Sequence, residues 1–324
     1  MYKIFFSGDS LSNLKRKELS YQGYEIDQGG YSIKDDELKK IVENYDAILL
    51  GGNEYYSKEI LDESNRKLKL ISFLGHNPSR FIDLKAAKEN NIIVTNTPKI
   101  IIKPLAEITI SYILLALREL DKIIYTENQI WNRTITKNLY GQTVGIIGLG
   151  NIGARVAKIL SFGFNANVIY YDIKRNIELE NVLDIKYVSL EELCKTSDII
   201  TLHCTSEPEN YNIINSENLN LMKNNCILIN CAKAELINKE DLYNALFNNK
   251  IKQAVFYGYY NTKGEYLYDE IAKQDDLFKL GDKFKLNRYS AWTAEDSVLE
   301  MQKVGIDNMI RVLNNQICEN IVKI

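Results

Sequence analysis

The chain has few of the residues from which metal centres and disulfide frameworks are built. Its 324 residues include only two histidines, His76 and His203, and its five cysteines form no C-x-x-C pair. Structural zinc sites draw their ligands from closely spaced cysteines and histidines, so the sequence argues against a metal centre. An odd number of scattered cysteines is typical of reduced thiols in a cytosolic protein. We therefore expect no metal and a cytoplasmic location.

Long hydrophobic runs and an excess of charge of one sign are also missing. No stretch reaches the about 18 consecutive apolar residues that cross a bilayer. The start, MYKIFFSGDS, lacks the apolar stretch and cleavage site of a signal peptide. The formal net charge is -3, and no basic cluster is interleaved with aromatics. The charge balance argues against a dedicated nucleic-acid or membrane-surface protein.

What the sequence does contain is a regular alternation of apolar runs and charged, helix-like segments. In the first third, runs such as KIFFSG, AILLGG and IIVTNT are separated by segments such as IKDDELKKIVENY. A second series extends from TVGIIGLG to KLNRYS, and a long amphipathic helix is predicted from Ala294. Between the two series, PLAEITISYILLALREL is apolar on most faces, which is typical of a helix buried between domains or in a dimer. Alternating strands and helices predict an α/β protein with parallel sheets.

The stretch GIIGLGNIGARVAKIL has glycines in the pattern G-x-G-x-x-G, at Gly148, Gly150 and Gly153. It follows a predicted strand and opens a predicted helix, which is the context that a dinucleotide-binding loop requires. The first glycine permits a tight turn, the second lets the backbone approach a pyrophosphate, and the third allows close helix–strand packing. The helix N-terminus then offers free N–H groups to the phosphates.

The next predicted strand ends in Asp172, 19 residues after Gly153. A carboxylate at this position accepts hydrogen bonds from both ribose hydroxyls and repels a 2′-phosphate, which favours NAD over NADP. Lys174 and Arg175 follow closely, and their positive charges weaken that preference slightly.

The chain resembles the D-isomer-specific 2-hydroxyacid dehydrogenases over nearly its whole length. IDLKAAKENNIIVTNTP is similar to the family's first-domain signature, LAEITISYILLAL to its inter-domain and dimer helix, and GQTVGIIGLGNIG to its NAD fingerprint. SDIITLHCTSEPEN resembles the strand that ends in Leu-His-x-Pro, with Thr205 in place of the proline. MKNNCILINCAKAELINKEDLYNAL resembles the stretch around the family's Ala-Arg-Gly, and YSAWTAEDS the segment that starts with its catalytic histidine.

The resemblance implies two Rossmann-like or flavodoxin-like domains with parallel sheets. A NAD-binding domain of residues 104–288 would be inserted into a discontinuous substrate domain of residues 1–103 and 289–324. It also implies NAD as the cofactor and a homodimer formed through the NAD domain. The residues expected to contact the cofactor are Thr109, Gly148, Gly150, Asn151, Ile152, Gly153, Asp172, His203, Cys204, Thr205, Cys231, Ala232 and Tyr257.

The positions of the family's catalytic residues have all changed. Its members move a hydride between nicotinamide and the 2-carbon of a 2-oxo or 2-hydroxy acid, with an arginine, a histidine and a glutamate. The arginine position falls on Lys233, which keeps the charge but loses the planar fork that matches a carboxylate. The histidine position falls on Tyr289, and the glutamate position near Thr262, with Glu265 three residues further on.

The loop that holds the substrate carboxylate has changed as well. Family members use the backbone N–H groups of a Gly-x-Gly loop, and here the sequence reads LGHNPSRFID. Gly75 is kept, and Asn77 replaces the second glycine. His76 and Arg80 are therefore expected near the substrate. The positive charges of Lys233 and Arg80 predict that this substrate is a small anionic molecule.

Three interpretations follow. In the first, the chain is an active NAD oxidoreductase in which Tyr289 transfers the proton beside Lys233. A phenol titrates near ~10, and a nearby ammonium lowers that value toward neutrality. In the second, His76 is the general acid/base, because an imidazole titrates near neutral pH. In the third, loss of the arginine, glutamate and histidine together leaves a catalytically inactive NAD-binding homologue that acts as a sensor or partner protein.

Overall fold

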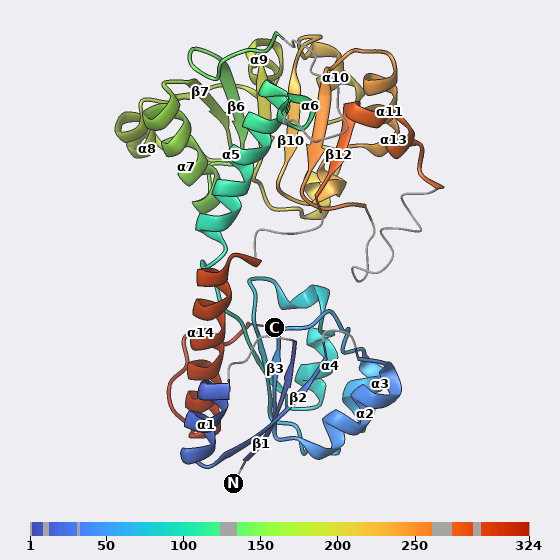
Figure 1. Ribbon diagram of the computed structural model, residues 1–324, viewed down its shortest axis with the longest axis vertical. Coiled ribbons are helices and arrows are strands. Elements are labelled where there is room, and N and C mark those ends of the chain that lie inside the picture. The colour runs from blue at the N-terminus through green and yellow to red at the C-terminus, as the bar shows by residue number, and fades with distance from the viewer. Residues whose placement is uncertain are drawn as a thin grey trace. The chain divides into compact units, whose positions relative to one another are not determined.

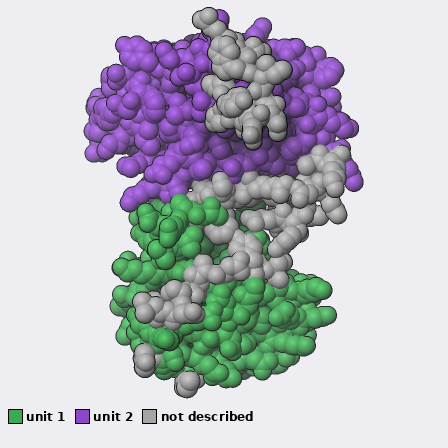
Figure 2. Space-filling model, viewed as in Figure 1, with its two compact units in different colours: residues 1–101, 263–265, 293–324 green, residues 102–262, 266–292 purple. Residues whose placement is uncertain are grey.

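The computed structural model describes residues 2–8, 13–30, 33–123, 135–260, 274–287 and 293–323 of the chain. The chain divides into two compact units (Figure 2). Unit 1 comprises residues 1–101, 263–265 and 293–324, and unit 2 comprises residues 102–262 and 266–292. Unit 1 is thus built from segments on both sides of unit 2 in the sequence.

Unit 1 contains a parallel sheet, five-stranded in the described residues, with the order β2-β1-β3-β4-β5. Its strands are β1 (Tyr2–Ser7), β2 (Tyr24–Gly29), β3 (Ala47–Leu50), β4 (Leu70–Phe73) and β5 (Ile93–Thr95). This is the flavodoxin-like order, in which the chain reverses direction across the sheet next to β1.

Helices cover both faces of this sheet (Figure 1). They are α1 (Asn13–Tyr21), α2 (Asp35–Asn44), α3 (Lys58–Leu61), α4 (Leu84–Glu89) and α14 (Glu295–Leu313). Ile4 and Phe6 of β1 pack with α1 and α14, whereas Phe5 packs on the opposite face with α2, α3 and α4. This alternation follows from the two-residue period of a strand. The long helix predicted from Ala294 is α14, and it returns the end of the chain to unit 1.

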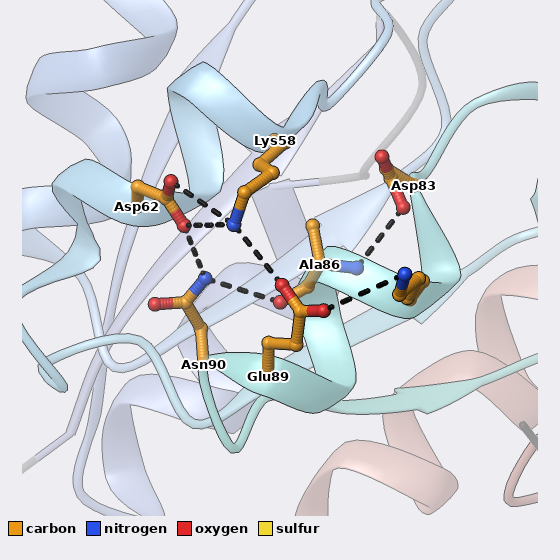
Figure 3. Close-up of polar contacts among 7 residues, drawn as sticks. Lys58, Asp62, Asp83, Ala86, Glu89 and Asn90 are labelled. Atoms are coloured by element: carbon orange, nitrogen blue, oxygen red, sulfur yellow. Dashed lines mark hydrogen bonds and ion pairs between the residues drawn. The ribbon is translucent and has the colours of Figure 1, made fainter.

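A polar network ties α3 to α4 on the surface of unit 1 (Figure 3). The ammonium of Lys58 lies 3.0 Å from a carboxylate oxygen of Glu89 and 3.3 Å from Asp62. The side-chain amide of Asn90 donates to Asp62 at 2.8 Å and to the carbonyl of Ala86 at 3.1 Å. Exposed ion pairs of this kind contribute only about 0–1 kcal/mol each. The network therefore orients two short helices more than it stabilises the unit.

Unit 2 contains a second parallel sheet, seven-stranded in the described residues, with the order β12-β11-β10-β9-β6-β7-β8. Its strands are β6 (Thr143–Ile147), β7 (Asn167–Tyr171), β8 (Lys186–Tyr187), β9 (Ile199–Leu202), β10 (Ile227–Asn230), β11 (Gln253–Phe256) and β12 (Phe284–Leu286). The strand order reverses between β6 and β9, and ligands bind at such a point beyond the carboxyl ends of the strands.

The helices of unit 2 also lie on both faces of the sheet (Figure 1). They are α5 (Ile102–Arg118), α6 (Leu120–Ile123), α7 (Asn151–Lys158), α8 (Ile177–Leu183), α9 (Leu190–Thr196), α10 (Ser216–Leu221), α11 (Lys239–Phe247) and α13 (Asp276–Lys279). The apolar helix predicted near Pro104 is α5, and it packs on α7 and β10 within unit 2. The structure confirms the prediction of two domains with parallel sheets, one of them inserted between two segments of the other.

None of the helices in the described part of the chain is long and apolar enough to span a membrane.

Candidate cofactor and active site

The glycine-rich loop leaves β6 where the strand order reverses. Gly148 directly follows β6 and has a φ of +95°, in the left-handed region that favours glycine. A Cβ on Gly148 would lie 2.5 Å from the backbone nitrogen of Cys204, which follows β9. A Cβ on Gly153, in the first turn of α7, would overlap the carbonyl oxygen of Gly148. Only glycine fits at both positions, because the loop, α7 and the end of β9 are packed backbone against backbone.

The amino terminus of α7 is open. Its N-cap is Gly150, no side chain caps it within the described residues, and a Cβ on Gly150 would have no neighbour within 4 Å. Asn151 is exposed and Ile152 half-buried in the first turn. Because the first N–H groups of a helix have no intrahelical partners, this end offers both donors and space to an anion.

Asp172 follows β7 beside the same loop. One carboxylate oxygen accepts from the N–H of Leu149 at 2.6 Å, and the other accepts from the N–H of Lys174 at 3.3 Å. A carboxylate accepts about four hydrogen bonds, so this one keeps capacity for two ribose hydroxyls. The bond from Leu149 fixes the carboxylate against the glycine-rich loop, so its position does not depend on a ligand.

His203 is the first residue after β9. Its backbone N–H donates to the carbonyl of Ile147 at 2.7 Å, and Nε2 lies 2.9 Å from the hydroxyl oxygen of Thr201. Burial lowers the pKa of His203 to about 3, so the ring is neutral at physiological pH. Nδ1 is buried and has no hydrogen-bond partner in the described residues. A buried polar atom of this kind calls for an explanation, and a ligand at this edge of the sheet supplies one.

Lys233 lies just beyond β10, on a turn built by a buried asparagine. The side chain of Asn230 accepts from the N–H of Ala232 at 3.0 Å and donates to the carbonyl of Lys233 at 3.0 Å. This Asx-type turn fixes the backbone at the carboxyl end of the strand. The Lys233 side chain is exposed, and its ammonium makes no hydrogen bond or ion pair in the described part of the chain. An exposed ammonium is therefore presented at the carboxyl edge of the sheet, where ligands bind in open α/β sheets.

Three residues expected at the cofactor have buried side chains. Thr109 of α5 is inaccessible, and its hydroxyl donates to the carbonyl of Leu105 at 2.7 Å. Cys231 is buried next to Thr109, and this burial raises the pKa of its thiol to about 12. Tyr257, directly after β11, is buried as well. Their surroundings are those of packing residues, and cofactor contact by their side chains stays a prediction.

In unit 1 the expected substrate loop follows β4. The carbonyl of Gly75 accepts from the N–H of Thr97 at 2.9 Å, and the carbonyl of His76 accepts from the side chain of Asn96 at 2.7 Å. Asn77 caps the short 3-10 turn Pro78–Arg80 by accepting from the N–H of Ser79 at 3.2 Å. These bonds shape the loop and leave the imidazole of His76 and the side chain of Arg80 exposed.

The structure thus gathers at one edge of unit 2 the residues that follow β6, β7, β9 and β10. Tyr289, Thr262 and Glu265 lie outside the described residues, so the role assigned to Tyr289 stays a prediction. Sequence reasoning missed Asn230, which builds the turn under Lys233. The available signal was an asparagine at the end of an apolar strand, a residue that often closes a turn on its own backbone.

Comparisons with known proteins agree with this arrangement. Residues 110–266 match the model of the NAD-binding domain of D-isomer-specific 2-hydroxyacid dehydrogenases. A 2-hydroxyacid dehydrogenase homolog of Haemophilus influenzae is 30% identical over 295 residues, which cover 87% of this chain and 87% of that protein. The chain belongs to the D-isomer-specific 2-hydroxyacid dehydrogenases.

One further relative and one solved structure cover the chain to different extents. D-3-phosphoglycerate dehydrogenase of Methanocaldococcus jannaschii is 31% identical over 291 residues, or 89% of this chain and 53% of that protein. The apo structure of D-lactate dehydrogenase from Escherichia coli is 22% identical and aligns over 99% of this chain and 100% of its own, with a TM-score of 0.82. The second likeness shows that the fold is the same.

As a member of this family, the chain is a NAD-dependent oxidoreductase of the class that acts on CH–OH groups. Unit 2 fits the cofactor on its own geometry. The uncapped end of α7 suits the pyrophosphate, and the anchored carboxylate of Asp172 suits the adenosine ribose.

The open space at Gly150 gives a direct test of where the pyrophosphate lies. In the dehydrogenase, Gly150→Ala is expected to weaken NADH binding by roughly tenfold, because the added methyl group takes the space of the approaching phosphate. Stability should change by no more than about 0.5 kcal/mol, since φ is -72° and nothing contacts the methyl. Fluorescence titration with NADH and thermal unfolding measure the two effects. Unchanged NADH affinity would place the pyrophosphate elsewhere.

Proposed function

We propose that this chain transfers a hydride between NAD(H) and a 2-oxo or 2-hydroxy acid, or a related carbonyl, with an altered set of catalytic residues. Lys233 would bind the anionic end of the substrate, and Tyr289 would exchange the proton. The observation that carries the proposal is the exposed ammonium of Lys233 on a turn fixed by Asn230, at the same sheet edge as the glycine-rich loop.

Lys233 supplies charge without the geometry of an arginine. A guanidinium binds a carboxylate through two parallel N–H bonds, whereas an ammonium acts as a compact point charge on a flexible stem. A lysine at this place still neutralises a substrate carboxylate and still polarises a carbonyl oxygen. It holds the substrate in one orientation less strictly, which favours a wider range of carbonyl substrates than an arginine would.

Tyr289 is the proposed proton donor because it takes the position of the family's catalytic histidine in the sequence. NADH, when bound, would supply the hydride. The phenol of Tyr289 would give its proton to the substrate oxygen on which negative charge develops. Gly75, Asn77 and Arg80 are proposed to bind the substrate from unit 1, with the backbone of the loop fixed by the bonds from Asn96 and Thr97. A homodimer through the NAD domain also stays a proposal.

His76 is the competing acid/base, since its imidazole is exposed and lies in the proposed substrate loop. A catalytically inactive NAD-binding homologue is the second candidate function. It is favoured by the same substitutions, because the arginine, histidine and glutamate positions have changed together.

The test is an assay of the purified chain with NADH against a panel of 2-oxo acids, aldehydes and imines, followed at the nicotinamide absorbance. Oxidation of NADH that depends on one class of carbonyl supports the proposal. Tight NADH binding with no turnover on any member of the panel would reject both enzymatic interpretations and leave the inactive homologue.

Lys233→Ala is expected to raise the KM for an active anionic substrate by roughly 10–100-fold, the effect of losing one hydrogen bond to a charged group. The kcat should fall less, and NADH affinity should stay the same. Lys233→Arg restores the fork and is expected to keep KM near the original value or below it. Lys158→Ala is the control, because Lys158 is exposed at the carboxyl end of α7, away from the glycine-rich loop. A KM unaltered by Lys233→Ala would remove the role proposed for the lysine.

A further inference from the structure

The arginine that follows Asp172 is held by a carboxylate of the protein. Arg175 stands three residues after Asp172, where a cation would be placed to bind the 2′-phosphate of NADP. We propose that Glu180 makes unit 2 select NAD over NADP, by holding the Arg175 guanidinium away from a 2′-phosphate. The proposal concerns cofactor choice alone and does not depend on which residue performs the catalysis.

The pair has the geometry of a strong ion pair. Nε of Arg175 donates to one oxygen of Glu180 at 2.9 Å, and a terminal nitrogen donates to the other oxygen at 2.8 Å. Such a bidentate pair occupies the Nε–H and one terminal N–H of the guanidinium, a pair of donors that would otherwise suit a phosphate. The Glu180 side chain is only 11% exposed, so the pair is shielded from water on the glutamate side.

A second tie fixes Glu180 itself. The hydroxyl of Tyr170, a buried residue of β7, donates to Glu180 at 2.8 Å and accepts from the N–H of Asn176 at 2.9 Å. The Arg175 guanidinium, helped by the Tyr170 hydroxyl, holds the pKa of Glu180 below its usual value. Glu180 is therefore charged at neutral pH, and it is anchored to the sheet as well as to α8.

Tyr187 links Arg175 to Asp172, the residue expected at the ribose. Its guanidinium carbon lies 5.8 Å from the ring centroid of Tyr187, and the hydroxyl of Tyr187 donates to the carbonyl of Asp172 at 3.3 Å. One tyrosine ring thus spans from Arg175 to Asp172. Under this proposal, an Arg175 guanidinium released from Glu180 would rotate toward a 2′-phosphate bound next to Asp172.

That rotation is unfavourable in the protein as it stands. It would break two charge-assisted hydrogen bonds and leave the carboxylate of Glu180 with Tyr170 as its remaining partner. Removing two hydrogen bonds from a carboxylate that is only 11% exposed costs more than removing them from a fully exposed one. The charges of Asp172 and Lys174 cancel. The net charge that this end of β7 offers to a phosphate therefore depends on whether Arg175 is paired with Glu180.

Glu180→Gln tests the proposal, because glutamine keeps an acceptor for Tyr170 and loses the charge that holds Arg175. The NADPH dissociation constant is expected to fall by roughly tenfold or more, the effect of one charge-assisted hydrogen bond. The NADH dissociation constant should stay within about twofold. Titration of the full chain with each cofactor, followed by nicotinamide fluorescence, gives both values without any need for turnover. Glu178→Gln is the matched control, an exposed glutamate on the same helix.

The double variant Glu180→Gln, Arg175→Ala shows whether the arginine carries the effect. It should return NADPH binding to the level of the unmodified protein. If Glu180→Gln weakened the binding of NADH and of NADPH equally, Glu180 would only support the fold. The proposal would also be overturned if NADPH affinity did not rise in Glu180→Gln, or if it rose equally in Glu178→Gln. A raised NADPH affinity that persisted in the double variant, without Arg175, would overturn it as well.

Discussion

Replacing Tyr289 with phenylalanine is expected to lower kcat by roughly 10²–10⁴-fold, the usual contribution of a general acid/base. Phenylalanine keeps the ring and removes the hydroxyl that would exchange the proton. Because the proposed role is chemical, NADH affinity should stay nearly unchanged. Steady-state kinetics with an active carbonyl substrate and a separate NADH titration measure the two quantities.

Tyr140→Phe is the control for this substitution, since Tyr140 is 71% exposed and has no proposed role. Loss of NADH binding in Tyr289→Phe would mean that the tyrosine packs against the cofactor and does not act on protons. Full turnover in Tyr289→Phe would move the acid/base elsewhere, and His76→Gln would then be the variant expected to lose activity.

Gly153→Ala is expected to have the largest effect on the fold of unit 2. The added Cβ would overlap the carbonyl oxygen of Gly148, and neither group can move without shifting α7 away from β6. Overpacking of this kind costs about 1–3 kcal/mol, against which the better helix propensity of alanine returns at most about 1 kcal/mol. The shift also displaces the amino terminus of α7 from the phosphates. We expect a lower midpoint of thermal unfolding and the loss of measurable NADH binding.

Gly163→Ala is the matched substitution, in the π-helical turn Ile159–Gly163 that continues from α7. Its Cβ would meet only a methyl group of Ile159, at 4.0 Å, which is ordinary contact. Stability should therefore change by no more than about 0.5 kcal/mol, and NADH binding should not change. Equal behaviour of the two variants would contradict the role given to the packing at Gly153.

Much of the fold could be predicted from local pattern. The apolar runs at Ile227–Asn230 and Thr143–Ile147 are strands, and the glycine spacing after Ile147 identified the loop between β6 and α7. These features are readable because strand periodicity and glycine requirements act over a few residues. The return of α14 to unit 1 came from the family resemblance, because no local pattern says which sheet a distant helix will cover.

At the site, the directions of the side chains could not be predicted from the sequence. Thr109 and Cys231 are expected at the cofactor from the sequence; both are buried in the structure, and their contact with the cofactor stays a prediction. Lys174 and Arg175 were treated alike as nearby charges, although Arg175 is engaged by Glu180 and Lys174 is not. In each case the direction of a side chain depends on partners that are set by packing.

The sequence by itself determined the parallel α/β architecture, the dinucleotide loop at Gly148, Gly150 and Gly153, and the carboxylate at Asp172. Each of these depends on residue type and on spacing along a short segment of chain. Only the tertiary structure decided that Lys233 is exposed on the turn built by Asn230, with no ion pair to the residues that the structure describes. It also decided that the charge of Arg175 is neutralised by Glu180. The reason is physical: what a charge does depends on the groups it meets in space, and those groups come from other turns and strands.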